Sequence, residues 1–486
     1  MNQDSPPRAP GSDRRKTKIV ATVGPASREP EVLRELISAG ADVLRLNLAH
    51  ATAEEHAENV SRIRAASAEV GREVGILADL PGPKLRLGDL EGDVAVLHSA
   101  STVTMRGTED GVVGNADLLP VQWPEFARAV KQGDTVFLAD GRVRLRVAAV
   151  VGDDVSLEVE AGGAVSSHQG VNLPGADAAL PALGGGDQGW IDFACEQQID
   201  LLAVSFVRSP ADLEDVGARV RERGAEIPLI AKIEKPQAAE RAEEIIAAAE
   251  SGIMVARGDL GVELPLEEVP GAQKRLIALA GRASKPAITA TQMLATMVRA
   301  SRPTRAEVTD VANAIYDGTD AVMLSEETAV GEHPVEAIRV MDRIARATEL
   351  RLPYGDWVFN RVDEGEHDVS EAVAQHAVAV AYRLDLPAIV VPTSSGRTAR
   401  LISSFRPRVP VLAVSSSLAT VRRMNLLFGM QAVQAEEWTS LRQLLDNCAV
   451  LAREQGLAGS GDMVAVTAGL PSQELGTNLF EVHRVP

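Results

Sequence analysis

The sequence predicts an α/β fold: a (β/α)8 TIM barrel with an inserted small β-barrel cap domain and a C-terminal α/β open-sheet domain. Three observations predict it. Short apolar, β-branched runs alternate with amphipathic helical segments, which is typical of parallel βα units. This rhythm stops near Gly82 and resumes near Leu180, with three strands before the interruption and five after it. A polar stretch over 354–368 then precedes a further α/β segment.

The predicted barrel strands are short and apolar, and helical segments with recognisable start signals lie between them. Thr52 with Glu55, and Thr304 with Glu307, have the spacing of capping boxes. Eight βα units favour a closed barrel over an open doubly wound sheet. The strands are expected within TKIVATV, DVLRLN and VGILADL, and then within LLAVSF, LIAKIE, IMVARG, AITATQ and AVMLSE.

The interruption reads as a small all-β insert. Strand-like runs such as VAVLH, DTVFLAD and VSLEVE are separated by Gly-Asp and Asp-Gly turn pairs. The expected organisation is therefore a disordered tail (1–15), the barrel (16–81 and 181–353), the β cap (82–180) and a C-terminal α/β domain (365–486). The residues discussed below make the barrel the expected catalytic domain and the C-terminal domain the expected regulatory one.

Composition excludes several classes of protein. Lys and Arg total 49 against 68 Asp and Glu, and the net charge of −19 disfavours binding to nucleic acid or to an anionic membrane. No apolar run approaches the roughly 18 residues of a membrane span, and the N-terminus is not a signal peptide. Cys195 and Cys448 are too few for a disulfide framework or a zinc site, so we expect a cytoplasmic protein. His56 is expected to lie on the surface.

Polar residues gather at the C-terminal ends of the predicted strands, where the chemistry of such barrels takes place. Side chains at i and i+2 share one face of a strand, so Lys232 and Glu234 point the same way. A Lys and a Glu within an apolar strand are costly unless they are paired or bind something. The alternative is a structural ion pair inside the barrel mouth. The other strand ends carry Arg45, Asn47, Asp79, Ser205, Gly258, Asp259 and Thr291.

Glu234 and Asp259, on neighbouring strands, could together hold one Mg²⁺. This ion is usually bound by one or two carboxylates, with substrate and water completing its shell. Arg45 and Lys232 would face the same pocket. Cations, a carboxylate pair and a hydroxyl suit a phosphorylated carboxylic acid, which implies phosphoryl transfer or enolate stabilisation. Gly258 lacks a Cβ and lets backbone N–H groups approach an anion.

Motifs along nearly the whole chain, from Thr17 to Pro486, resemble one family. They are TKIVATVGPAS, ADVLRLNLAH, ADLPGPKLRLG, HQGVNLPG, AKIEKP, IMVARGDLGVELP, ATQML, RPTRAEVTDVANAIYDGTDAVMLSEETAVGEHP and VTAGLPSQELGTN. In this order they resemble pyruvate kinase, whose barrel, β cap and C-terminal domain match the expected architecture. The resemblance implies transfer from phosphoenolpyruvate to ADP, giving pyruvate and ATP as the last step of glycolysis. It implies Mg²⁺, with Mn²⁺ as a substitute, and a homotetramer.

The resemblance implies roles for the residues at the strand ends. Arg45 and Lys232, helped by Ser205, would hold the phosphoryl group of phosphoenolpyruvate. Lys232 would also stabilise charge on the moving phosphoryl group and on the enolate. Glu234 and Asp259 would be the Mg²⁺ ligands.

The substrate carboxylate and the nucleotide have expected sites of their own. The backbone at Gly258 and Asp259, with the Thr291 hydroxyl, would bind the carboxylate, and Thr291 with a water would protonate the enolate. Gln169 stands where the family commonly has a Lys, which leaves the nucleotide preference open. The nucleotide side would be formed by Asn47, His50, Arg86 and Gln169.

The expected monovalent-cation site departs from the family pattern. Members that need K⁺ hold it with an Asn, a Ser, an Asp and a backbone carbonyl. Asn47 and Asp79 are present here, but Ala49 replaces the Ser and Leu80 stands where a Thr is usual. Lys84 occupies the position of a Glu in K⁺-dependent members. We expect its ammonium to replace the cation, so that K⁺ is not required; alternatively, Lys84 is a solvated surface lysine.

A Ser/Gly-rich segment of the C-terminal domain precedes a predicted helix. Such a loop is a ready anion site, and it resembles the family's effector loop, so we expect a sugar-phosphate or nucleotide effector. The alternative is a capped helix start with no ligand. The residues are Thr393, Ser394, Ser395, Gly396, Arg397 and Thr398.

Two rival functions remain at this point. One is another Mg²⁺-dependent barrel enzyme acting on phosphoenolpyruvate or pyruvate, such as a dikinase domain or an aldolase, but those lack the inserted cap. The other is a catalytically silent regulator, which would have no reason to keep buried charges that cost stability.

Overall fold

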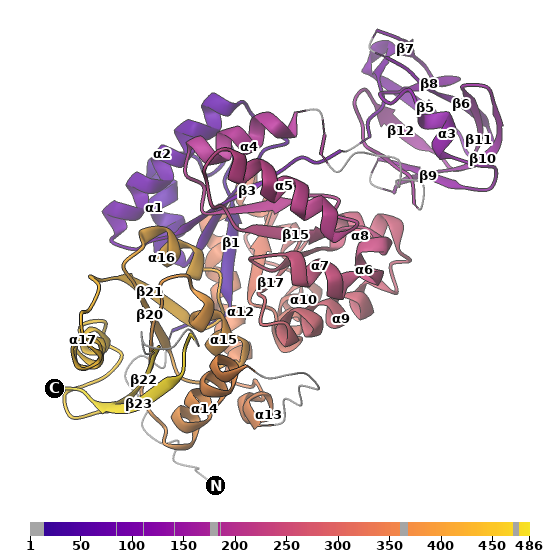
Figure 1. The fold of residues 1–486 in the computed structure, drawn as a ribbon. Helices are drawn as coiled ribbons and strands as arrows, with labels where there is room; N and C mark the ends of the chain where they lie inside the picture. The colour runs from indigo at the N-terminus through magenta and orange to yellow at the C-terminus, as the bar shows by residue number, and fades with distance from the viewer. Residues whose placement is uncertain are drawn as a thin grey trace.

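The protein is described from a computed structural model that covers residues 14–83, 85–109, 111–139, 141–174, 183–184, 186–359, 368–469 and 476–486. Its central unit is a closed barrel of parallel strands (Figure 1), in which each strand pairs with the next barrel strand along the chain. This confirms the predicted fold class. The barrel strands are β1 (Lys18–Thr22), β2 (Val43–Asn47), β3 (Gly75–Asp79), β14 (Leu201–Val204), β15 (Leu229–Ile233), β16 (Ile253–Ala256), β17 (Ala287–Ala290) and β18 (Ala321–Leu324).

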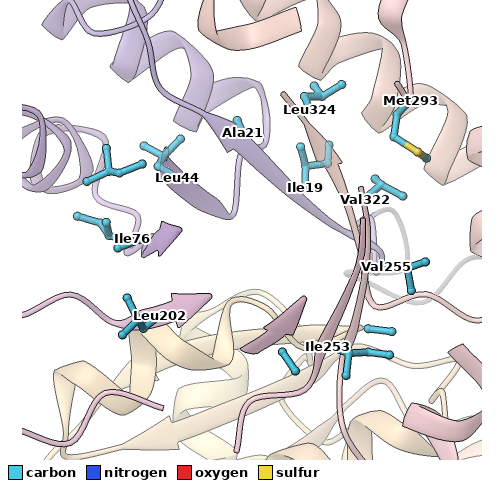
Figure 2. Close-up of a cluster of buried hydrophobic side chains, with 14 of the residues drawn as sticks. Ile19, Ala21, Leu44, Ile76, Leu202, Ile253, Val255, Met293, Val322 and Leu324 are labelled. Atoms are coloured by element: carbon cyan, nitrogen blue, oxygen red, sulfur yellow. The ribbon is translucent and has the colours of Figure 1, made fainter. Parts of the chain in front are cut away.

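Helices surround the barrel and bury one face of each strand. The predicted capping box starts α2: Glu55 N donates to Thr52 Oγ1 (3.3 Å) and Thr52 N donates to Glu55 Oε2 (3.1 Å). Figure 2 shows apolar side chains of the layer between strands and helices, such as Ile19, Leu44 and Val322. The helices are α1 (Pro30–Ala39), α2 (Ala53–Val70), α4 (Asp187–Glu196), α5 (Pro210–Glu222), α6 (Pro236–Glu240), α7 (Ala242–Ala248), α8 (Arg257–Glu263), α9 (Val269–Arg282), α10 (Arg305–Tyr316), α11 (Glu326–Ala329) and α12 (Pro334–Glu349).

The described residues of the insert after β3 form strands and loops apart from the short α3 (Phe126–Ala129) and a 3-10 turn at Glu91–Asp93, and the insert projects away from the barrel, at the upper right of Figure 1. Buried and exposed residues alternate along the first half of β10, because one face of its sheet covers a separate apolar core. One sheet has the order β13-β9-β10-β11-β6-β8, and β12 pairs with β5 and β4 with β7. The strands are β4 (Asp89–Leu90), β5 (Val94–Leu97), β6 (Thr102–Gly107), β7 (Val113–Gly114), β8 (Leu118–Val121), β9 (Thr135–Leu138), β10 (Val143–Val151), β11 (Asp154–Ala161), β12 (Gly163–Ser166) and β13 (Val171–Asn172).

The C-terminal domain is an open sheet flanked by helices, as predicted. Its strand order is β21-β20-β19-β22-β23, and only the edge strand β23 runs antiparallel to its neighbour in this described sheet. The elements are α13 (Tyr354–Phe359), α14 (Val369–Arg383), β19 (Ile389–Pro392), α15 (Arg397–Ser404), β20 (Val411–Ser415), α16 (Leu418–Met424), β21 (Met430–Gln434), α17 (Leu441–Glu454), β22 (Met463–Ala468) and β23 (Leu479–Arg484).

The C-terminal domain closes the floor of the barrel. Leu426, just after α16, is 1% exposed and packs with inward-facing strand residues such as Val20 and Leu77. Asn425 Nδ2 donates to the Glu73 carbonyl at 2.9 Å, just before β3 begins. In the described residues this packing covers the floor and leaves the opposite end of the barrel, where the strands have their C-termini, as the side for a ligand. In the part of the chain that the structure describes, no helix is both long and apolar enough to span a bilayer.

The N-terminal segment corrects one prediction. The predicted tail of residues 1–15 includes Arg15, but its side chain is 5% exposed and pairs with Asp42 and Asp342, each at 2.9 Å. The rest of that tail, up to residue 13, lies outside the described residues. Local composition could not reveal this contact, because the two carboxylates are supplied by distant parts of the chain.

Asp42 is expected to be a main stabilising charge at the barrel floor. Burial would raise its pKa, but Arg15, Lys18 and Arg72 outweigh burial and lower the pKa from 3.8 to about 2. Asp42→Asn should lower the free energy of unfolding by about 3 kcal/mol near neutral pH, because a buried pair loses one partner. A carboxyl group with a depressed folded-state pKa stabilises above its unfolded pKa and loses that contribution as pH falls.

Urea unfolding of both proteins measures this effect. The difference in the free energy of unfolding between wild type and Asp42→Asn should shrink as the pH falls from 3.8 towards about 2, where the wild-type carboxylate takes up a proton. A difference that is the same at neutral pH and near pH 2 would contradict this account of Asp42.

Candidate active site

Four charged side chains and a hydroxyl meet at the C-terminal ends of β2, β3, β14 and β15. The Lys232 ammonium lies 2.7 Å from Ser205 Oγ, 3.1 Å from Asp79 Oδ1 and 2.8 Å from Glu234 Oε1. Arg45 Nη2 lies 2.7 Å from Asp79 Oδ2. All five residues are buried, so these interactions are desolvated and are stronger than they would be in water.

The charges in this cluster shift one another's pKa values. Burial would lower the pKa of Lys232, but Asp79 and Glu234 outweigh it and raise the pKa above its ordinary value. Burial would raise the pKa of Asp79, but Lys232 and Arg45 lower it overall. Both shifts favour the charged forms of Lys232 and Asp79.

Glu234 differs from Asp79 in its balance of charge. Its pKa is raised, first by burial and then by Asp259, despite the nearby Lys232. Phe206 N donates to Glu234 Oε2 at 2.8 Å, whereas Oε1 is buried and accepts no hydrogen bond of good geometry. A buried carboxylate oxygen of this kind, with a second carboxylate nearby, fits a small hard cation.

The second carboxylate comes from the next strand. β15 pairs with β16 so that Ile233 lies opposite Val255, and Asp259 follows in the first turn of α8. Among the described residues no cluster of three or more His, Cys, Asp or Glu could form a complete metal site. A cation held by Glu234 and Asp259 would therefore take its remaining ligands from substrate and water.

Thr291 directly follows β17, the strand that pairs with β16, and its backbone conformation is unusual. Its φ is +70°, a left-handed conformation that is a genuine outlier for a β-branched residue. Gly258 N donates to Thr291 Oγ1 (2.8 Å), and this hydroxyl donates to the Ala290 carbonyl (2.6 Å). Arg257 Nη2 donates to the Thr291 carbonyl (2.8 Å), and Arg257 Nη1 is paired with Asp310 (2.7 Å). Strain of this kind collects at functional sites.

Arg257 is a residue whose role the sequence analysis missed. It lies in the VARGDLG motif, and no role was predicted for it. In the structure its side chain donates to the Thr291 carbonyl and so holds that backbone in place. The motif itself was a signal, because it puts an Arg directly before the Gly258 and Asp259 pair.

The predicted nucleotide residues fall into two groups. Asn47 Oδ1 accepts from Ala49 N (3.3 Å) in the loop after β2, where His50 is exposed. The other two belong to the cap: Arg86 Nη1 donates to the His168 carbonyl (3.1 Å), and Gln169 Oε1 accepts from Ser166 N (2.9 Å). The structure therefore places Asn47 and His50 on the barrel, and Arg86 and Gln169 on the cap. Lys84 lies outside the described residues.

His56 corrects a second prediction, since it is 3% exposed rather than a surface residue. Its Nε2 lies 2.7 Å from the His50 carbonyl, and its ring packs edge-on against Trp190 and Phe193. Burial lowers its pKa. It thus supports the loop that carries His50. The signal was present in its spacing, because His56, Val60 and Ile63 share the buried face of α2.

The predicted effector loop lies between β19 and α15. Gly396, with φ +82°, donates its N–H to Thr393 Oγ1 at 3.0 Å, and Thr420 Oγ1 donates to the Ser394 carbonyl at 2.9 Å. Arg397 is exposed and paired with Asp368. The side chain of Thr398 contacts Thr477.

Comparisons with known proteins agree with this architecture. Residues 14–338 match the family described as pyruvate kinase, barrel domain, and residues 371–483 match pyruvate kinase, alpha/beta domain. A pyruvate kinase of Geobacillus stearothermophilus is 42% identical over 97% of this chain and 80% of its own length. Those of Thermococcus litoralis and Thermotoga maritima are 39% and 38% identical over 97% of this chain, and the matches cover 99% and 100% of their lengths. The chain belongs to the pyruvate kinase family of phosphotransferases.

Proposed function

We propose that this protein transfers the phosphoryl group of phosphoenolpyruvate to ADP in a Mg²⁺-dependent reaction that gives pyruvate and ATP. The observation that carries the proposal is the buried Lys232 ammonium, which lies 2.8 Å from Glu234 and 3.1 Å from Asp79 at the open end of the barrel. Such a fixed cation beside a carboxylate pair suits a doubly charged phosphoryl group that must move between two oxygens.

Arg45 and Lys232 bind the phosphoryl group in this proposal. Asp79 holds both of them from one side, since its two oxygens contact the two different cations. The cations are thereby oriented before substrate arrives, which is the condition for strong electrostatic catalysis. As the bond to the enol oxygen breaks, Lys232 stabilises the negative charge that collects on that oxygen.

Glu234 and Asp259 fit Mg²⁺, with Mn²⁺ as a substitute, and the bound ion would neutralise charge between the phosphoryl group and the nucleotide phosphates. Glu234 is positioned for this role by the hydrogen bond from Phe206 N to its Oε2, while its Oε1 lies 2.8 Å from the Lys232 ammonium. Ser205 donates its hydroxyl proton to the Leu80 carbonyl at 2.7 Å and so presents a lone pair to Lys232.

Thr291 delivers the proton to the enolate. Its hydroxyl is fixed between Gly258 N and the Ala290 carbonyl. To pass its proton to the enolate, Thr291 must release the Ala290 carbonyl, and a water that exchanges protons with solvent then reprotonates the threonine oxygen. The backbone at Gly258 and Asp259 would bind the substrate carboxylate at this edge of the site, with the Gly258 N–H exchanging its bond to Thr291 Oγ1 for one to the substrate.

The function is tested by pyruvate release from phosphoenolpyruvate with Mg²⁺. Release that requires ADP supports the proposal. Release without ADP would indicate a phosphatase, and no release by the folded protein would indicate a silent regulator.

The family resemblance also supports a homotetramer that works in the cytoplasm in glycolysis, and sedimentation velocity tests the assembly.

Activity is expected to be independent of K⁺. Asp79, a ligand in K⁺-dependent members, has its charge balanced here by Arg45 and Lys232. The Lys84 ammonium would supply the remaining positive charge. Turnover should be equal with K⁺ and with tetramethylammonium, and Lys84→Glu should make it K⁺-dependent. Wild-type turnover seen only with K⁺ would discard this part of the proposal.

The loop of residues 393–398 is proposed to bind a sugar-phosphate or nucleotide effector. Sugar bisphosphates, sugar monophosphates and AMP are added in turn, and the phosphoenolpyruvate concentration at half-maximal rate is measured. Arg397→Ala should remove the response, because Arg397 is the exposed cation of the loop. Arg442→Ala, at a 93% exposed arginine of the same domain, is the control. An intact response in Arg397→Ala would count against this site.

A further inference from the structure

The cap is joined to the barrel through two linkers that meet at one buried carboxylate. The first linker leaves β3 at residues 82–83, and the second returns towards α4 at residues 183–184. Gly82 N donates to Asp187 Oδ1 (3.3 Å), and Gly184 N donates to Asp187 Oδ2 (2.6 Å). The linkers are also close to each other, since a Cβ on Gly184 would lie 2.9 Å from the Gly82 carbonyl oxygen.

The two hydrogen bonds to Asp187 serve different parts of the structure. The bond from Gly184 is local and is the kind that any helix start can form with an acidic residue of its first turn. The bond from Gly82 spans 105 positions and contributes nothing to starting the helix. Asp187 is 1% exposed, so its carboxylate is costly to bury, and burial raises its pKa. The long-range bond calls for a role beyond capping α4.

The junction of the linkers touches the reactive cluster. Gly82 has φ +69°, and a Cβ there would lie 2.9 Å from both Ser205 Cβ and Phe206 Cδ2. Ser205 accepts a hydrogen bond from Lys232, and Phe206 N holds Glu234. The cap is therefore attached against the residues that position the phosphoryl-binding Lys and the metal-binding Glu.

We propose that Asp187 is a positioning residue: by tying both linkers together it fixes the cap at the barrel mouth and so places the cap's nucleotide-side groups relative to Lys232. The part that concerns nucleotide rests on the proposed function. Arg86, only four residues beyond Gly82, is the group whose position depends most directly on this junction.

Asp187→Asn tests the kinetic consequence. An amide offers one acceptor and turns its NH₂ towards the other N–H, so one bond is lost. We expect the KM for ADP to rise about tenfold, as for one lost hydrogen bond to a charged group. The Kd of phosphoenolpyruvate, measured by calorimetry without nucleotide, should be unchanged. A merely structural role would lower kcat through the active fraction and leave the KM for ADP unchanged. Asp192→Asn is the control, since this carboxylate of α4 faces Arg223 instead.

A distance measurement tests the junction without using activity. Cys195 and Cys448 are replaced, and spin labels are placed at Val151 on the cap (73% exposed) and Leu350 on the barrel (70% exposed). Asp187→Asn should broaden the distribution of distances between the labels, and Asp192→Asn should not.

A second variant keeps the test valid if Asp187→Asn does not fold. Gly184→Ala should broaden the same distribution, because its Cβ would press on the Gly82 carbonyl, whereas Gly189→Ala meets nothing within 4 Å and should not. Narrow distributions in the folded variants, with an unchanged KM for ADP, would overturn the proposal. If Asp187→Asn broadens the distance distribution but the protein without this substitution shows no turnover, the role of Asp187 is kept and the proposed function is rejected.

Discussion

Lys232→Met is expected to lower kcat for pyruvate formation by about 10³-fold or more, which is the loss seen when a single preorganised cation or donor at a moving phosphoryl group is removed. Methionine keeps the length and apolar stem of the side chain and removes the charge. The ammonium contacts Ser205, Asp79 and Glu234, so its removal takes away the positive charge between these groups. The rate is measured under saturating phosphoenolpyruvate, ADP and Mg²⁺.

The control for Lys232 is Lys274→Met, at a lysine of α9 that is 62% exposed and pairs with Asp317. It should turn over like wild type. Circular dichroism and the unfolding midpoint must show that Lys232→Met is folded, because its loss leaves Asp79 and Glu234 with less compensating charge. A folded Lys232→Met protein within tenfold of the wild-type rate would contradict the role given to this ammonium.

Glu234→Gln should weaken the apparent affinity for Mg²⁺ by roughly 10²-fold, since even groups that only support a metal ligand contribute 10–100-fold. Glutamine keeps the shape and can still accept from Phe206 N, so the change isolates the charge. The readout is Mn²⁺ binding followed by electron paramagnetic resonance, with and without phosphoenolpyruvate, together with the Mg²⁺ dependence of turnover.

The control for Glu234 is Glu240→Gln at the exposed end of α6. It should bind Mn²⁺ like wild type. Unchanged Mn²⁺ affinity in Glu234→Gln would show that the carboxylate only balances Lys232, which is the structural ion-pair alternative.

Much of the fold could be predicted because local signals and tertiary structure agree. The βα rhythm gave the eight barrel strands, and the capping boxes at Thr52 and Thr304 start α2 and α10 as expected. The i, i+2 spacing also placed Lys232 and Glu234 on one face, and their atoms lie 2.8 Å apart.

The contacts that the sequence could not reveal depend on distant residues. Asp79 was expected only as a cation ligand, yet its place between β2 and β14 lets it contact both Arg45 and Lys232. The left-handed backbone of Thr291 opposes the local preference of a β-branched residue, so it depends on Arg257 at the start of α8. Asp187 bonds a glycine 105 positions away, which no periodicity could indicate.

The most direct test of the central claim is the fate of the phosphoryl group itself. Phosphoenolpyruvate labelled with ³²P is incubated with the protein, ADP and Mg²⁺, and the products are separated. The proposed function predicts that the label appears in the γ-phosphate of ATP, in equal amount to pyruvate, and that Lys232→Met slows the transfer by about 10³-fold or more. Label released as inorganic phosphate, or retained by phosphoenolpyruvate in the presence of the folded wild-type protein, would contradict the account.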